Sequence, residues 1–82
     1  MSITEIINSN SRKQEVSTAR MAIAYNLRNS GLKVNEVGKK IKRDHSTVTY
    51  LVQKCKDLIL VRDKKTIEAV QNYQQNLHEL IS

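Results

Sequence analysis

The residues best suited to chemistry in this chain stand in one short segment, where positions 44–47 carry Asp, His, Ser and Thr. Each of these side chains can meet the edge of a base pair. Asp44 can accept from a cytosine amino group, and His45 can donate to a purine N7 or a carbonyl oxygen. The hydroxyls of Ser46 and Thr47 can serve either role, and a Thr methyl can pack on a thymine methyl. The segment is therefore a candidate base-contacting site.

A run of basic residues leads into this segment, and it consists of Lys39, Lys40, Lys42 and Arg43. Two roles stay open for Lys39 and Lys40. They contact nucleic-acid phosphates, or they interact with the helix dipole, as lysines in the last turn of a helix do. That explanation does not cover Lys42 and Arg43, which continue the run to the next element. We therefore favour contact with nucleic-acid phosphates for the run.

The elements that must position these residues are helices. The chain has no proline and only two glycines, and its apolar residues recur at helical spacing. We expect helices over residues 2–7, 14–29, 34–41, 45–60 and 64–81, with breaks at 8–11, 30–31 and 42–44. With no Phe or Trp, the core must be aliphatic. The prediction is an all-α bundle of four to five helices that forms one domain over residues 1–82.

The stretch 34–60 has the pattern of a helix-turn-helix, in which the second helix enters the major groove. Residues 44–47 would then begin the recognition helix. A second role for Asp44 is capping of that helix, and the two roles are compatible. Capping gives no reason for His45. Gly38 lies inside the shorter helix, which is explained if a neighbouring helix approaches closely there.

The net charge of +6, from 14 basic and 8 acidic residues, favours a polyanionic partner. Double-stranded DNA comes first and an anionic membrane surface second. The membrane is disfavoured because the basic residues cluster in a turn rather than along one helix face. With no secretory signal and no long apolar run, we expect a cytoplasmic, nucleoid-associated protein.

Enzymatic classes are disfavoured. The sequence shows no supported nucleophile–base pair, no paired carboxylates and no cofactor motif. Cys55 is the single cysteine and forms no zinc spacing with His45 and His78. We therefore expect no catalytic residue, no metal, no cofactor and no small-molecule substrate, and we expect Cys55 to serve as a small core residue.

Residues 43–48, with the sequence Arg-Asp-His-Ser-Thr-Val, resemble the Arg-Asp-His-Thr-Thr-Val signature of a known family. That family is the C-terminal, Trp-repressor-like helix-turn-helix domain of the bacterial replication initiator DnaA. Glu36-Val37-Gly38 matches the approach to the signature, and Ala19-Arg20 and Ser11-Arg12-Lys13 match segments upstream. The resemblance covers nearly the whole chain, and residues 36–48 are its specific part.

The resemblance implies a role for each matching position. Asp44, His45 and Ser46 would contact bases in the major groove, and Thr47 and Arg43 would contact bases or phosphates nearby. Arg12 and Lys13 would approach the minor groove. The full set expected at phosphates or in the minor groove is Arg12, Lys13, Arg20, Val34, Asn35, Lys39, Lys40, Lys42 and Arg43.

The chain also departs from the DnaA pattern. Ile41-Lys42 stands where DnaA usually has Phe-Gly-Gly, and Ser46 replaces a Thr and so lacks its methyl group. There is no phosphate-binding loop and no room for an ATPase domain in 82 residues. We therefore expect a stand-alone, small regulator of transcription or replication rather than an initiator.

An alternative hypothesis is a protein-interaction module that keeps the fold. Its basis is the apolar surplus of residues 58–61 and of the last helix, with Ile67, Val70, Tyr73, Leu77, Leu80 and Ile81. Two interpretations stay open for these residues. They close a small core, or they form a seam for a homodimer or for a protein of the replication machinery.

Overall fold

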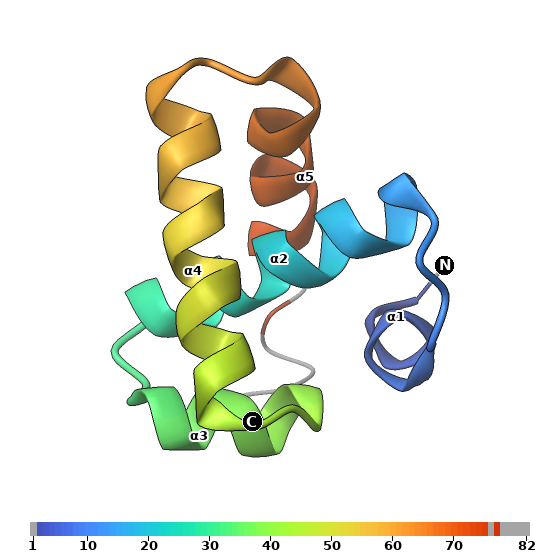
Figure 1. Ribbon diagram of the computed structural model, residues 1–82, viewed down its shortest axis with the longest axis vertical. Coiled ribbons are helices and arrows are strands. Elements are labelled where there is room, and N and C mark those ends of the chain that lie inside the picture. Colours follow the sequence, from blue (N-terminus) through green and yellow to red (C-terminus); the bar gives the residue numbers. More distant parts are fainter. Residues whose placement is uncertain (1, 76, 78–82) are drawn as a thin grey trace.

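Helix α2 is the element around which the other helices are arranged. The computed structural model describes residues 2–75 and 77, and within them there are five helices and no strand. They are α1 (Ile3–Asn8), α2 (Gln14–Asn29), α3 (Val34–Ile41), α4 (His45–Leu60) and α5 (Lys64–Gln74). α4 and α5 are joined by a short turn, and α2 packs against all four other helices (Figure 1). The prediction of an all-α bundle with a helix pair at 34–60 is confirmed.

Helices α1, α4 and α5 begin where an N-cap side chain accepts from a free backbone N–H group. In α1, the Ser2 hydroxyl accepts from the Glu5 N–H and the Glu5 carboxylate accepts from the Ser2 N–H, both at 3.2 Å. In α5, Asp63 accepts from the Thr66 N–H at 3.0 Å and from its hydroxyl at 2.6 Å. Gly31 follows the end of α2 with φ of +106°, a conformation that favours glycine.

The core is aliphatic, as predicted. α1 contributes Ile3, Ile6 and Ile7 to it. α2 is buried on more than one side because several helices cover it, and its buried residues are Val16, Ala19, Met21, Ala22, Ile23, Ala24, Asn26 and Leu27. Cys55 is fully buried, and burial raises the pKa of its thiol to about 11, so it is a neutral buried side chain as expected. None of the described helices is long and apolar enough to cross a membrane.

The last helix is shorter than predicted. α5 ends at Gln74 instead of continuing to residue 81, and Leu77 reaches the core from a turn. Thr66 is the buried residue of the helix, whereas Ile67, Val70 and Tyr73 are half-buried. The predicted positions Leu80 and Ile81, and also His78, lie outside the described residues.

Gly38 lies at the closest approach between α3 and the residues that follow it. A Cβ at this position would stand 2.6 Å from the Arg43 carbonyl oxygen and 3.6 Å from a methyl carbon of Val48. The expectation of a close approach is confirmed. The nearest neighbour is the backbone of the turn rather than the following helix itself.

We predict that Gly38→Ala destabilises the fold. The new methyl group must displace the turn backbone, and such overpacking costs about 1–3 kcal/mol. The better helix propensity of Ala offsets only about 1 kcal/mol of this. Thermal unfolding followed by circular dichroism measures the change. Lys40→Ala, at an exposed position of the same helix, is the matched control and should leave the midpoint nearly unchanged. A midpoint for Gly38→Ala equal to or above that of the wild type would contradict the prediction.

Candidate nucleic-acid interface

The turn between α3 and α4 depends on a left-handed residue. Lys42 has φ of 58° and ψ of 46°, and the Arg43 N–H donates to the Gly38 carbonyl at 3.0 Å, which closes the end of α3. Glycine usually takes this position, and a side chain there costs about 1 kcal/mol. Lys42 also uses its side chain, because its Nζ donates to Asn8 Oδ1 at 2.9 Å. The left-handed residue Lys42 therefore also links the turn to the end of α1 through its side chain.

The first turn of α4 presents three kinds of side chain. Asp44 is the N-cap, and its carboxylate accepts from the Thr47 N–H at 2.8 Å. Hydrogen bonds from the side chain and the backbone of Thr47 lower the pKa of Asp44. His45 and Ser46 are exposed and their side chains make no hydrogen bond within the described residues. Val48 is buried and fixes the helix on the core. The capping role expected for Asp44 is confirmed.

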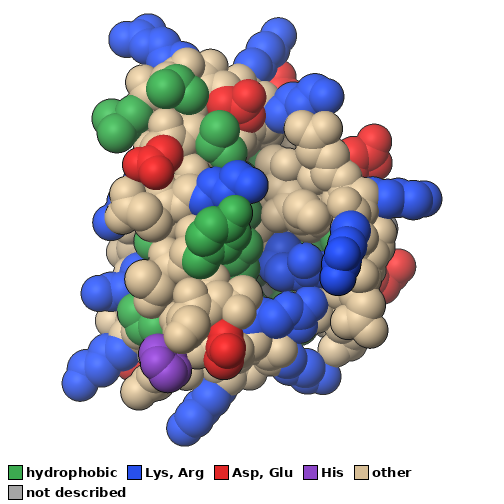
Figure 2. All heavy atoms as spheres, viewed as in Figure 1, with side chains coloured by type: hydrophobic (Ala, Val, Ile, Leu, Met, Phe, Trp, Pro, Cys, Tyr) green, Lys and Arg blue, Asp and Glu red, His purple; other side chains and the backbone are tan. Residues whose placement is uncertain are grey.

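α3 and the start of α4 enclose a shallow hollow of about 450 Å³. Its lining brings together most of the predicted helix-turn-helix site residues, namely Asn35, Lys39, Lys42, Arg43, Asp44 and His45, with Gly38 as its floor. Val34 is half-buried at the start of α3, and Lys40 is exposed in its last turn. Basic side chains surround this lower end of the molecule (Figure 2). The arrangement combines positive charge with exposed hydrogen-bonding groups.

Arg43 is held by backbone carbonyls in a way that the sequence did not reveal. Its Nη1 donates to the carbonyls of Lys42 at 3.0 Å and Ile41 at 3.4 Å, and its Nη2 donates to the carbonyl of Ser9 at 3.1 Å. The first two bonds satisfy free carbonyls at the end of α3, as a basic residue near a helix C-terminus can do. The third joins this turn to the end of α1.

Arg20 reaches the same carbonyl from α2, since its Nη2 donates to Ser9 O at 2.7 Å. Burial lowers the pKa of Arg20, and the charge of Arg43 lowers it further. The structure thus brings Arg20 and Arg43 together beside the segment between α1 and α2. Arg12 and Lys13 lie in that segment and are exposed, outside the hollow between α3 and α4.

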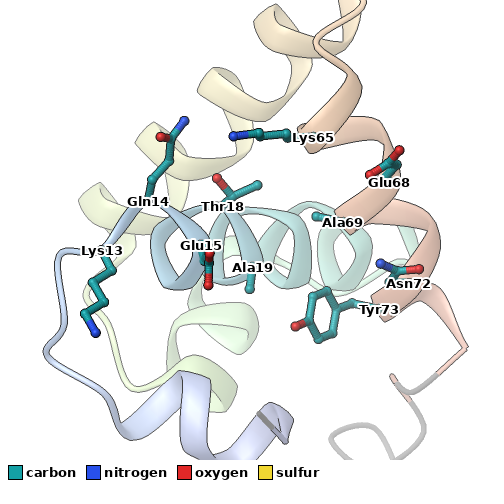
Figure 3. A pocket seen from close by; sticks show the side chains of 10 residues that line it. All are labelled: Lys13, Gln14, Glu15, Thr18, Ala19, Lys65, Glu68, Ala69, Asn72 and Tyr73. Carbon is teal, nitrogen blue, oxygen red and sulfur yellow. The ribbon is translucent and has the colours of Figure 1, made fainter.

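A second hollow, of about 590 Å³, lies between α2 and α5 (Figure 3). Lys13 is the one predicted site residue in its lining. Lys13 and Lys65 are balanced there by Glu15 and Glu68, so this hollow offers no net charge to a polyanion. Within the part of the chain that the structure describes, no three His, Cys, Asp or Glu residues lie close enough to hold a metal ion.

A short helix, a tight turn and a longer helix with an exposed polar first turn define a helix-turn-helix domain of the DNA-binding class. The family model described as the bacterial dnaA protein helix-turn-helix matches residues 3–55, and the chain belongs to this family. DNA binding follows from that membership, and the family is not an enzymatic one. No curated protein and no solved structure matches the chain.

We predict that the Asp44 cap stabilises the fold in a pH-dependent way. Asp44→Ala should lower the free energy of unfolding at neutral pH, and Asp44→Asn, which can still cap, should lower it by less. Because the folded state lowers the pKa of Asp44, the ionised carboxylate stabilises above its ordinary value of 3.8. This contribution is lost as the pH falls through the lowered pKa.

Urea unfolding of both variants and the wild type, at neutral and at acid pH, measures this contribution. The gap between wild type and Asp44→Ala should shrink at acid pH. Asp57→Asn, at an exposed carboxylate in the body of α4, controls for general charge effects. An equal gap at both pH values would show that ionisation of Asp44 has no part in capping.

Proposed function

We propose that this protein binds double-stranded DNA sequence-specifically and acts as a small regulator of transcription or replication. The observation that carries the proposal is the first turn of α4. There His45 and Ser46 are exposed and unpaired next to a capped Asp44, on a helix whose other face is buried. Exposed donors and acceptors at the start of a recognition helix are what reading of base edges requires.

In this proposal His45 and Ser46 contact bases, and Asp44 and Thr47 contact bases or phosphates beside them. Phosphates beside the site are neutralised by Lys39, Lys40 and Lys42. The start of α3 lies along the DNA backbone, with Asn35 exposed there and Val34 next to it. Arg12 and Lys13 approach the minor groove. Arg20 and Arg43 keep guanidinium N–H groups that Ser9 does not occupy, and these suit phosphate oxygens.

We predict specific binding that depends on both His45 and salt. Selection from random duplexes provides the site, and titrations of that site and of an unrelated duplex at several salt concentrations provide the affinities. If about five phosphates are neutralised, the log–log salt slope should be about −4 to −5. His45→Ala should weaken binding to the selected site by about 1–3 kcal/mol and spare the unrelated duplex.

The matched control is Gln53→Ala, which alters an exposed polar residue two turns further along α4. It should change neither affinity by more than about twofold. Absence of binding at low salt would refute DNA binding by this protein. An equal loss on both duplexes in His45→Ala would refute base contact by His45.

A second candidate function is protein binding, and it rests on the far end of α4. Leu60 and Val61 are 80% and 73% exposed there, next to the left-handed Arg62 with φ of 60°. Apolar side chains lie among basic and acidic ones at this upper end (Figure 2). Exposed apolar residues beside backbone strain are typical of a contact surface. A recognition helix of 16 residues is about 24 Å long, so DNA and a partner can bind at once.

The charge around Leu60 and Val61 favours an acidic protein segment as the partner. Arg62, Lys64 and Lys65 are exposed and form no ion pair within the described residues. The nearby carboxylate of Asp63 is already engaged by Thr66. A second copy of the chain would bring like charges together across a small apolar contact, which is unfavourable for a dimer.

We predict that a labelled peptide with two Leu among Glu residues binds the protein while DNA occupies the other end. Leu60→Ser/Val61→Ser should weaken this binding at least about fivefold, because it removes the apolar contact. A peptide with Gln in place of Glu should bind more weakly to the wild type. Equal binding by wild type and variant would refute the surface, and a dimer in light scattering would identify a second copy as its occupant.

A further inference from the structure

We propose that Arg20 and Arg43, here called the arginine pair, fix the segment of residues 9–13 on the helix-turn-helix and so set where Arg12 enters the minor groove. In this role both are positioning residues, because they act on DNA through Arg12. The inference rests on the proposed function for its DNA step. Its first step, the fixing of the segment, is a property of the protein alone.

The geometry of the attachment involves three cationic donors. The Ser9 carbonyl accepts from Arg20 at 2.7 Å and from Arg43 at 3.1 Å. Beside it, Asn8 Oδ1 accepts from Lys42 Nζ at 2.9 Å. One donor comes from α2 and two from the turn before the recognition helix. The end of α1 is therefore attached directly to the part of the fold that orients α4.

The segment between this attachment and α2 is short and internally folded. The Ser11 N–H donates to the Ser9 hydroxyl at 3.0 Å, and the Lys13 N–H donates to the Ser11 hydroxyl at 3.2 Å. α2 starts immediately after Lys13. Arg12 thus lies between two fixed points only a few residues apart, and its backbone has little freedom to move relative to α4.

The charges of the arginine pair suit a polyanion better than they suit a purely structural link. Both guanidinium groups donate to one neutral carbonyl, and neither has a carboxylate partner within the described residues. Arg20 Nε is buried without a hydrogen-bond partner. Two like charges held together in this way repel each other, and an approaching DNA backbone supplies the missing negative charge. Bound DNA therefore strengthens the attachment that places Arg12.

The consequence is a fixed spacing between two kinds of contact. Residues at the start of α4 address the major groove, and Arg12 addresses a minor groove at a set distance from them. An arginine inserted in the minor groove favours A·T-rich sequence, where this groove is narrow and strongly negative. Loss of the attachment should therefore relax selectivity in the flank of the site and leave selectivity in the major groove intact.

The experiment compares the wild type with Arg20→Lys/Arg43→Lys. Lysine keeps the positive charges but replaces each planar fork of donors by a single ammonium group. Arg28→Lys is the matched control, because Arg28 also lies on α2 and also donates to a backbone carbonyl, that of Leu32 at 3.1 Å. Circular dichroism melting checks that the variants fold. Asn8→Ala, which removes the acceptor of Lys42, is a milder second variant.

The first measurement is amide hydrogen exchange in the free protein. The Ser11 and Lys13 amides should exchange at least about tenfold faster in the double variant than in the wild type, with an intermediate effect in Asn8→Ala and none in Arg28→Lys. Unchanged exchange at these two amides would overturn the proposal, whatever the protein does with DNA.

The second measurement uses the selected site with its flanking adenines replaced by 2,6-diaminopurine. This base adds an amino group in the minor groove and leaves the major-groove edge unchanged. Wild type and Arg28→Lys should lose about tenfold in affinity, and the double variant less than about threefold. Equal losses in all three proteins would overturn the proposal. Failure to bind any duplex would refute the proposed function, and the exchange result would still decide whether the pair holds the segment.

Discussion

The contact between the backbone at Gly38 and the carbonyl of Arg43 determines the geometry of the whole end of the molecule formed by α3 and the start of α4. The 2.6 Å that separates the carbonyl oxygen from the place of a Cβ leaves room for no residue but glycine without movement of the turn. Because the turn lies so close to α3, Lys42 must adopt a left-handed conformation, and α4 starts at once with Asp44 as its cap. The same turn carries the Arg43 side chain toward Ser9. The orientation of α4 and the attachment of α1 therefore share one cause.

The protein keeps its charges available instead of pairing them internally. No ion pair forms within the described residues, and the carboxylates of Glu5, Asp44 and Asp63 accept from backbone N–H groups at helix starts. Cohesion comes from an aliphatic core and from helix caps, both of which depend little on salt. The excess of basic residues remains for a polyanion. Folding and DNA binding thus depend on different interactions. A higher salt concentration should weaken DNA binding and change the stability of the fold little.

Most of the fold could be predicted because apolar spacing and helix-breaking residues agree along this chain. The bounds of α2, α3 and α4 follow from spacing, from the Ser30-Gly31 break and from Asp44, and the structure has them as expected. The match to Arg-Asp-His-Thr-Thr-Val pointed to the start of α4 as the proposed recognition helix. Contacts between distant residues could not be predicted, since neither pattern nor propensity contains them. The two arginines at Ser9, the bond of Asn26 to Val70 and the burial of Thr66 are of this kind. The end of α5 was missed because apolar spacing continued past it.

The hydrogen bond from Asn26 Nδ2 to the Val70 carbonyl, at 2.9 Å, shows that α5 is bonded to the stretch that matches the family. Asn26 lies in the stretch that matches the family, whereas Val70 lies 15 residues beyond its end at residue 55. A fragment cut at that end would leave the buried amide of Asn26 without its acceptor and would uncover the side of α2 against which α5 packs. The stretch that matches the family model is thus shorter than the stretch that builds the core. The packed core extends at least to Leu77, the last described side chain that enters it.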